Sequence, residues 1–223
     1  MTSKKTFLLS ASIICANALD LKADIRQLED GDVDYLHFDI MDGAFVPRLG
    51  LFPEMIASIK AISKIPISAH LMIEHPDNFI PAFAKAGADM IIIHAESTRH
   101  LDRSIRLVKN IGVKAGVALN PATPLSVIDY VLDNIDLVML MAINPGIVGH
   151  ALIPGAMKKI SDLKNKLRDY PNVLIEIDGG VTFKSAPDMI KMGANMLVCG
   201  SSTIFKPGEL ISKKIKELRQ LLK

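Results

Sequence analysis

Short apolar runs rich in Val, Ile and Leu alternate with longer amphipathic segments along the whole chain. The runs are five to eight residues long, which is typical of strands buried on both faces. They predict strands at residues 7–14, 35–41, 67–72, 90–94, 114–119, 137–142, 174–178 and 196–200. The segments between them predict helices at residues 18–28, 53–62, 77–86, 101–111, 124–132, 154–169, 185–192 and 209–222.

Buried strands that alternate with helices indicate parallel strands joined by βαβ units. Eight such units in 223 residues predict an α/β fold, a compact (β/α)8 TIM barrel. No linker or low-complexity tract interrupts the pattern, so we expect residues 1–223 to form a single domain. A doubly wound open sheet is the alternative, but no GxGxxG motif follows the first predicted strand.

Composition and charge exclude several classes of partner. A net charge of +2, a pI near 8.5, few aromatic residues and no Trp disfavour a nucleic-acid surface. The apolar run near the N-terminus is interrupted by Ser10, Ser12 and Asn17, which disfavours a signal peptide or a membrane span. Cys15 and Cys199 belong to no CxxC motif, so we expect two buried thiols. Together these features predict a soluble cytoplasmic protein.

Four potential metal ligands lie near the ends of three predicted strands: His37 and Asp39, then His70, then Asp178. Side chains two residues apart on a strand point to one face, so His37 and Asp39 can converge on one ion. A barrel carries its chemistry at the C-terminal ends of its strands, where all four side chains can meet. Two imidazoles and two carboxylates suit a catalytic divalent ion with open positions. The alternative is that each is a hydrogen-bonded polar residue at the barrel mouth.

Other residues fall at the same predicted mouth. Met41, Met72 and Met141 end the second, third and sixth strands, either as core filler or as an apolar lining beside the ligands. His94 ends the fourth strand and either borders the site or donates a hydrogen bond to a ligand. His75, His100 and His150 are expected in surface loops.

Glycine-bearing loops follow the sixth, seventh and eighth predicted strands. Backbone amides in such loops, with little side-chain obstruction, predict a phosphate cradle. Its candidate residues are Gly146, Ile147, Val148, Gly149, Gly179, Gly180, Gly200 and Ser201.

Several of these segments share their pattern with one known family. They are His37-x-Asp39-x-Met41-Asp42-Gly43 with Phe45-Val46-Pro47, His70-Leu71-Met72, Leu119-Asn120-Pro121-Ala122-Thr123-Pro124, Asn144-Pro145-Gly146, Asp178-Gly179-Gly180 and Gly200-Ser201. Together they resemble ribulose-phosphate 3-epimerase, from about Ser10 to Phe205.

The resemblance implies a ribulose-phosphate-binding barrel that inverts C3 of D-ribulose 5-phosphate to give D-xylulose 5-phosphate, a step of the pentose phosphate pathway, through a 2,3-enediolate. It assigns His37, Asp39, His70 and Asp178 as metal ligands, with Asp39 and Asp178 also as the acid/base pair. It places substrate contacts at Ser12, at His70, at the three methionines and along the glycine-bearing loops. One divalent ion is implied, with Zn favoured over Fe(II), Mn or Co. The family also implies a homo-oligomer.

The chain departs from the family pattern around the substrate rim. Gly146-Ile147-Val148-Gly149-His150 stands where the family has Gly-Phe-Gly-Gly-Gln, and Ala44 and Arg48 replace a common His and Asn. D-allulose 6-phosphate, one carbon longer, is therefore the alternative substrate. A barrel that binds a sugar phosphate or a metal without catalysis is a further alternative. Aldol or decarboxylation chemistry is disfavoured because the third predicted strand has no Asp-x-Lys-x-x-Asp motif.

Overall fold

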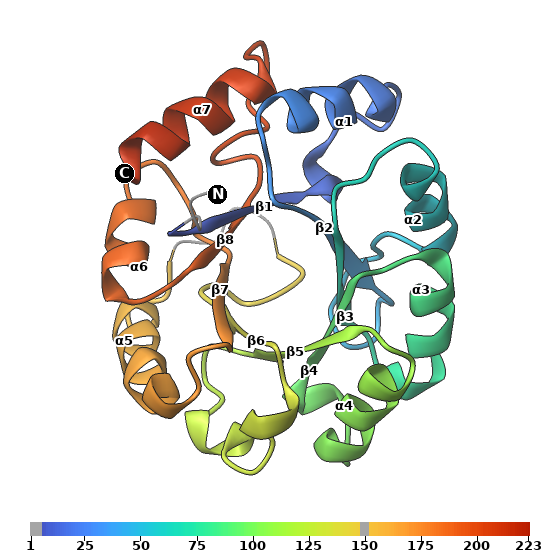
Figure 1. Ribbon diagram of the computed structural model, residues 1–223, viewed down its shortest axis with the longest axis vertical. Coiled ribbons are helices and arrows are strands. Elements are labelled where there is room, and N and C mark those ends of the chain that lie inside the picture. The colour runs from blue at the N-terminus through green and yellow to red at the C-terminus, as the bar shows by residue number, and fades with distance from the viewer. Residues whose placement is uncertain (1–5, 148–151) are drawn as a thin grey trace.

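Eight parallel strands close into one barrel in the computed structural model, which describes residues 6–147 and 152–223. The strands are β1 (Leu8–Ser12), β2 (Tyr35–Met41), β3 (Ile67–Met72), β4 (Met90–His94), β5 (Lys114–Leu119), β6 (Leu137–Met141), β7 (Leu174–Asp178) and β8 (Met196–Cys199). Each strand pairs with its neighbours in sequence, and β8 pairs with β1 to close the ring (Figure 1). The predicted α/β barrel is therefore confirmed, and the open sheet is excluded.

Seven α-helices surround the strands within the described residues (Figure 1). They are α1 (Leu21–Asp30), α2 (Pro53–Lys60), α3 (Ile80–Ala86), α4 (Leu101–Asn110), α5 (Ala156–Lys166), α6 (Ala186–Met192) and α7 (Ile211–Leu221). Short 3-10 segments cover Ile13–Cys15, Pro76–Asn78, Ala95–Ser97, Leu125–Ile128, Leu132–Asn134 and Leu167–Asp169.

The helix predicted at residues 124–132 is wrong. The chain forms two separate 3-10 segments there, Leu125–Ile128 and Leu132–Asn134. The stretch contains Val127, Ile128 and Asp129, and β-branched residues and Asp are weak helix formers. The periodic apolar pattern predicted a helix, but this segment between β5 and β6 contains few strong helix-forming residues.

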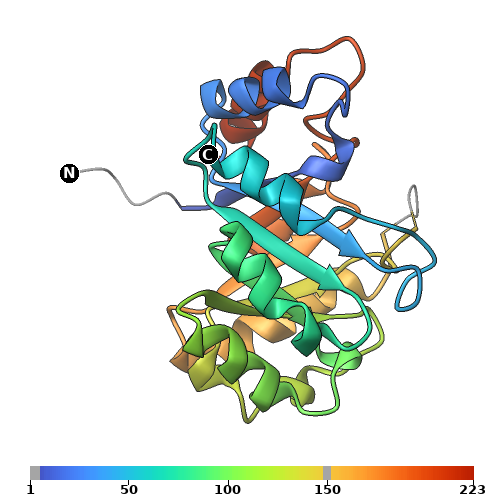
Figure 2. The same ribbon diagram turned by 90° about the vertical axis from the view of Figure 1, so that its right-hand side faces the viewer.

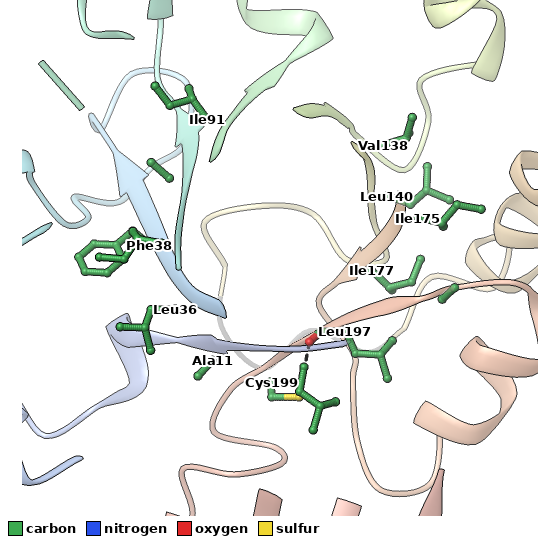
Figure 3. Packing of buried hydrophobic residues seen from close by; sticks show 14 of the residues in the cluster. Ala11, Leu36, Phe38, Ile91, Val138, Leu140, Ile175, Ile177, Leu197 and Cys199 are labelled. Atoms are coloured by element: carbon green, nitrogen blue, oxygen red, sulfur yellow. Dashed lines mark hydrogen bonds between the residues drawn. The ribbon is translucent and has the colours of Figure 1, made fainter. Parts of the chain in front are cut away.

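In every strand except β3, alternate residues belong to, or pack against, two separate apolar clusters. Leu36 and Phe38 of β2 pack in the cluster that also holds Ile25 of α1 and Ile56 of α2, so they point outward to the helices (Figure 3). Tyr35 of β2 belongs instead to a cluster made only of strand residues, which is the barrel interior. This alternation places the side chains of His37 and Asp39 inside the barrel.

All the strands run toward one end of the barrel, as β2 and β3 show in side view (Figure 2). The C-terminal ends of the strands and the loops that follow them therefore share one face of the molecule. None of the helices in residues 6–147 and 152–223 has the length and apolar character needed to cross a bilayer.

Candidate active site

The four predicted ligands meet at the C-terminal end of the barrel. In the register of the sheet, Asp39 of β2 lies beside His70 of β3, and Met141 of β6 lies beside Asp178 of β7. One ligand atom from each of His37, Asp39, His70 and Asp178 lies within 4.8 Å of the others. Both histidines are completely buried, and Asp39 is 8% exposed. Three strands thus bring the predicted residues to one point.

The distances between these atoms suit a single ion. His37 Nε2 lies 3.4 Å from Asp39 Oδ1 and 4.0 Å from Asp178 Oδ2. His70 Nδ1 lies 3.8 Å from Asp39 Oδ1 and 3.5 Å from Asp178 Oδ2. Two atoms bound at about 2.1 Å to one ion lie within roughly 4.2 Å of each other, so these atoms are close enough to share an ion.

Each histidine presents a buried nitrogen that makes no hydrogen bond with the described residues: Nε2 of His37 and Nδ1 of His70. The opposite nitrogen of each ring has a partner. His37 Nδ1 lies 3.3 Å from the Ser68 hydroxyl, and His70 Nε2 lies 2.9 Å from His94 Nε2. Buried polar atoms are rarely left without partners. Two such nitrogens facing two carboxylates fit a divalent ion well.

The buried charged groups of the site shift one another's pKa values. Burial disfavours the charged form of His37, but the Asp39 carboxylate outweighs it and raises the pKa of His37 to about 9. Burial likewise disfavours ionised Asp39, yet His37 and His70 hold the pKa of Asp39 well below its usual range. The Ser12 hydroxyl, at the end of β1, donates a 2.6 Å hydrogen bond to Asp39 Oδ2. Asp39 is therefore an ionised carboxylate held in place from two sides.

His94 and Glu96 form a partly buried contact on the far side of His70. His94 Nδ1 lies 3.1 Å from Glu96 Oε2, and the His94 side chain is fully buried. Burial lowers the pKa of His94 to about 4, despite the neighbouring carboxylate. Burial would raise the pKa of Glu96, but hydrogen bonds from His94, Thr123 and the Asn120 amide lower it to about 2. The structure places the His94 ring against His70, one of the predicted ligands, and outside the lining of the cavity.

Glu176 was not predicted as a residue of the site. It is completely buried on β7, and neither carboxylate oxygen makes a hydrogen bond within the described residues. Burial raises the pKa of Glu176 to about 7, against the opposing charges of His37 and His70. Its position two residues before Asp178 is the signal that could have found it, because the two side chains share the interior face.

A cavity of about 430 Å³ opens above these residues, within the range of small-molecule sites. Asp39, Asp178 and Ser12 line it, together with the predicted methionines Met41, Met72 and Met141. Arg48, from the loop after β2, is the one cationic side chain among the described residues of this lining. His37 and His70 lie beneath it, outside the lining.

The glycine-bearing loops form one side of this cavity. Its lining includes Gly146, Ile147, Gly179, Gly180, Gly200 and Ser201. Gly179 has φ +88°, and a Cβ there would come within 2.3 Å of Ile143 Cγ1, so only glycine fits. The candidates Val148, Gly149 and His150 lie outside the described residues.

The remaining predicted residues are placed as follows. His75 and His100 are exposed in loops, as expected. Both cysteines are free thiols. Cys199 is buried, but Cys15 is only partly buried and lines the cavity, which corrects the prediction of two buried thiols.

Comparisons with known proteins agree with this geometry. The model of the Ribulose-phosphate 3 epimerase family matches residues 8–205. The chain is 44% identical over 213 residues to ribulose-phosphate 3-epimerase of Bacillus subtilis, covering 95% of this chain and 97% of that protein. It is 36% identical over 220 residues to the Escherichia coli K12 protein of the same name, covering 98% and 97%. A solved structure, KGPDC from Streptococcus mutans, shares the fold with a TM-score of 0.72 at 11% identity, covering 98% of each chain.

Proposed function

This chain belongs to the ribulose-phosphate 3-epimerase family, and we propose that it interconverts D-ribulose 5-phosphate and D-xylulose 5-phosphate by metal-dependent, two-base proton transfer. The observation that supports this mechanism best is the convergence of two carboxylates and two unbonded imidazole nitrogens at the base of one cavity. His37, Asp39, His70 and Asp178 would hold the ion.

Inversion at C3 requires a proton to leave from one face and return to the other. The C3 proton is acidified by the adjacent C2 ketone, and its removal leaves a planar 2,3-enediolate. A bound divalent ion would supply stabilisation of the negative charge that develops on the C2 and C3 oxygens. Asp39 and Asp178 project into the cavity from β2 and β7, three strands apart around the ring, so they can act on opposite faces of the substrate.

The other residues of the cavity position the substrate. Ser12 hydrogen-bonds Asp39 and lines the cavity next to it. Met41, Met72 and Met141 give the reacting carbons an apolar surrounding that excludes water. The phosphate would lie on the backbone amides of the loops after β6, β7 and β8, with Arg48 as an additional positive charge.

The two-base assignment is tested with Asp39→Asn and Asp178→Asn. Each removes one acid/base group, so each should lower the rate of epimerisation by about 10²–10⁴-fold in both directions. Metal content is measured on the same samples by elemental analysis. Asp133→Asn, an exposed carboxylate in the turn before β6, is the matched control and should retain full activity. Near-normal epimerisation by Asp178→Asn with metal bound would show that the assignment is wrong.

The substrate is tested by comparing kcat/KM for D-ribulose 5-phosphate and D-allulose 6-phosphate. We expect the pentulose phosphate to be preferred, as the names of the relatives suggest. A preference for the hexulose phosphate would reassign the substrate, and no turnover of either would favour the non-catalytic barrel.

We also propose that the chain forms one domain, acts in the cytoplasm, assembles as a homo-oligomer and favours Zn over Fe(II), Mn or Co. The oligomer is tested by light scattering of the metal-loaded protein.

A further inference from the structure

A chain of hydrogen bonds runs from the loop after β5 to the metal site. Glu96 Oε1 accepts hydrogen bonds from the Asn120 amide at 2.8 Å and from the Thr123 hydroxyl. Its other oxygen, Oε2, lies 3.1 Å from His94 Nδ1. His94 Nε2 lies 2.9 Å from His70 Nε2, and the planes of the two rings are 21° apart. Three strand ends, β3, β4 and β5, are linked in this way.

The chemistry of these groups determines which partner donates in each hydrogen bond of the series from Glu96 through His94 to His70. A carboxylate has only acceptors to offer, so the proton between Glu96 and His94 lies on His94 Nδ1. A neutral imidazole with a proton on Nδ1 has a bare Nε2, which accepts. The contact between the two rings then requires His70 to donate from its own Nε2. The proton of His70 is thereby kept away from Nδ1, the nitrogen that faces Asp39 and Asp178.

Neighbouring residues hold His94 and Glu96 in place. His94 is completely buried, and the Phe45 ring packs against it with centroids 4.8 Å apart. Glu96 is fixed by partners that come from residues 24 and 27 positions later in the chain. Among the described residues, His37 Nδ1 lies 3.3 Å from the Ser68 hydroxyl, a group that can either donate or accept.

We propose that Glu96 and His94 are positioning residues that fix the Nε2-protonated tautomer of His70 and so present its bare Nδ1 to the metal ion. This inference rests on the metal-dependent function proposed above. Partners behind a metal-binding histidine orient its ring and raise its basicity, and their loss typically costs 10–100-fold in metal affinity.

The tautomer is measured directly by two-bond ¹H–¹⁵N NMR on Zn-loaded protein labelled at histidine nitrogens. We expect His70 to carry its proton on Nε2 and to bind zinc through Nδ1. In Glu96→Gln the resonance of the His70 Nε2 proton should shift upfield. Glu96 accepts from His94 and from Asn120 with two different oxygens, whereas a Gln side chain has one oxygen and can accept from only one of them. A His70 proton found on Nδ1 in the wild-type protein would overturn the proposal.

Zinc affinity gives the second readout, by competition with a chromophoric chelator and without substrate. Glu96→Gln and His94→Phe should each raise the zinc Kd about 10–100-fold. Because both act through one path, the double variant should bind no more weakly than His94→Phe alone. Glu74→Gln, the same chemical change at an exposed residue after β3, is the matched control and should stay within about twofold of wild type.

The outcomes separate this inference from the function on which it rests. Equal zinc affinity in wild type and Glu96→Gln would overturn the positioning role alone. Additive losses in the double variant would also contradict it, since independent structural damage adds. A wild-type protein that binds no divalent ion would overturn the proposed metal dependence itself. If His94→Phe fails to fold, the zinc affinity of Glu96→Gln and the tautomer of His70 still test the positioning role.

Discussion

The imidazole rings of His37 and His70 each contact a polar side chain through the nitrogen that faces away from the carboxylates. Ser68 lies behind His37, and His94 with Glu96 lies behind His70. Each arrangement leaves one nitrogen facing the carboxylates of Asp39 and Asp178. The proposed metal binding would therefore depend on residues that do not line the cavity.

The lowered pKa of Glu96 predicts a pH-dependent contribution to stability in chelator-treated protein. The carboxyl titrates near 4.5 when unfolded and near 2 when folded, so its ionised form stabilises the fold fully above pH 4.5. The Glu96→Gln variant should be less stable by about 1–2 kcal/mol at pH 7, allowing for solvent screening of a side chain that is 24% exposed. This difference should narrow as the pH falls below 4.5. Urea unfolding from pH 7 to 3.5 measures it, and a pH-independent difference would contradict the prediction.

Residues of the site could be predicted from the sequence where they share a local pattern, such as a spacing of two along one strand. His37 and Asp39 are two apart on one strand, so their common face is readable from the sequence. Glu176 carried the same signal relative to Asp178 but was overlooked among apolar neighbours. Glu96 lies in a 3-10 turn, and its partners Asn120 and Thr123 belong to another loop, so no local pattern could reveal its role.

The bounds of β2, β3, β4, β5 and β7 are those expected from the apolar runs. The change of residue character is clearest around β2, which lies between Asp34 and Asp42. The segment at residues 124–132 was wrong because apolar spacing suggested a helix while its composition favoured 3-10 turns. The loops depend on close approaches between elements, which the sequence alone does not display.

One such approach joins the loops after β6 and β2. Gly146 has φ +77°, and a Cβ there would lie 2.6 Å from Val46 Cβ. Gly146→Ala should therefore cost about 1–2 kcal/mol for its backbone conformation and about 1–3 kcal/mol more for crowding. It should also lower kcat/KM, because the displaced loops border the cavity.

Gly112→Ala is the matched control for this prediction. Gly112 also has a positive φ, +90°, but nothing lies within 4 Å of its added Cβ. We expect only the conformational cost of about 1–2 kcal/mol and unchanged activity. Urea unfolding and steady-state kinetics compare the two variants, and equal effects would refute the close-approach explanation.

At the scale of the whole molecule, the proposed ion would join strands from two sides of the ring. His37, Asp39 and His70 come from the adjacent strands β2 and β3, whereas Asp178 comes from β7. An ion bound by all four would stabilise the closed barrel against unfolding, since the unfolded chain has no such site.

Metal loading should therefore raise the thermal stability. At a free zinc concentration 100 times the Kd, the gain is about 2.7 kcal/mol, or roughly 5–10 °C in Tm for a chain of this length. Asp178→Asn should show a smaller rise at the same free zinc concentration. Calorimetry with and without chelator measures both, and a Tm that is independent of zinc would contradict a site that spans the barrel.

We propose that this barrel uses a bound metal and two carboxylates to exchange the C3 proton of a pentulose phosphate. Proton NMR of D-ribulose 5-phosphate in D2O tests it most directly, with metal-loaded and then with chelator-treated protein. We predict loss of the C3 proton signal together with formation of D-xylulose 5-phosphate, both abolished by the chelator and restored by added metal. Retention of the C3 proton with metal demonstrably bound, or exchange that persists after the metal is removed, would show that the protein is not a metal-dependent epimerase of this substrate.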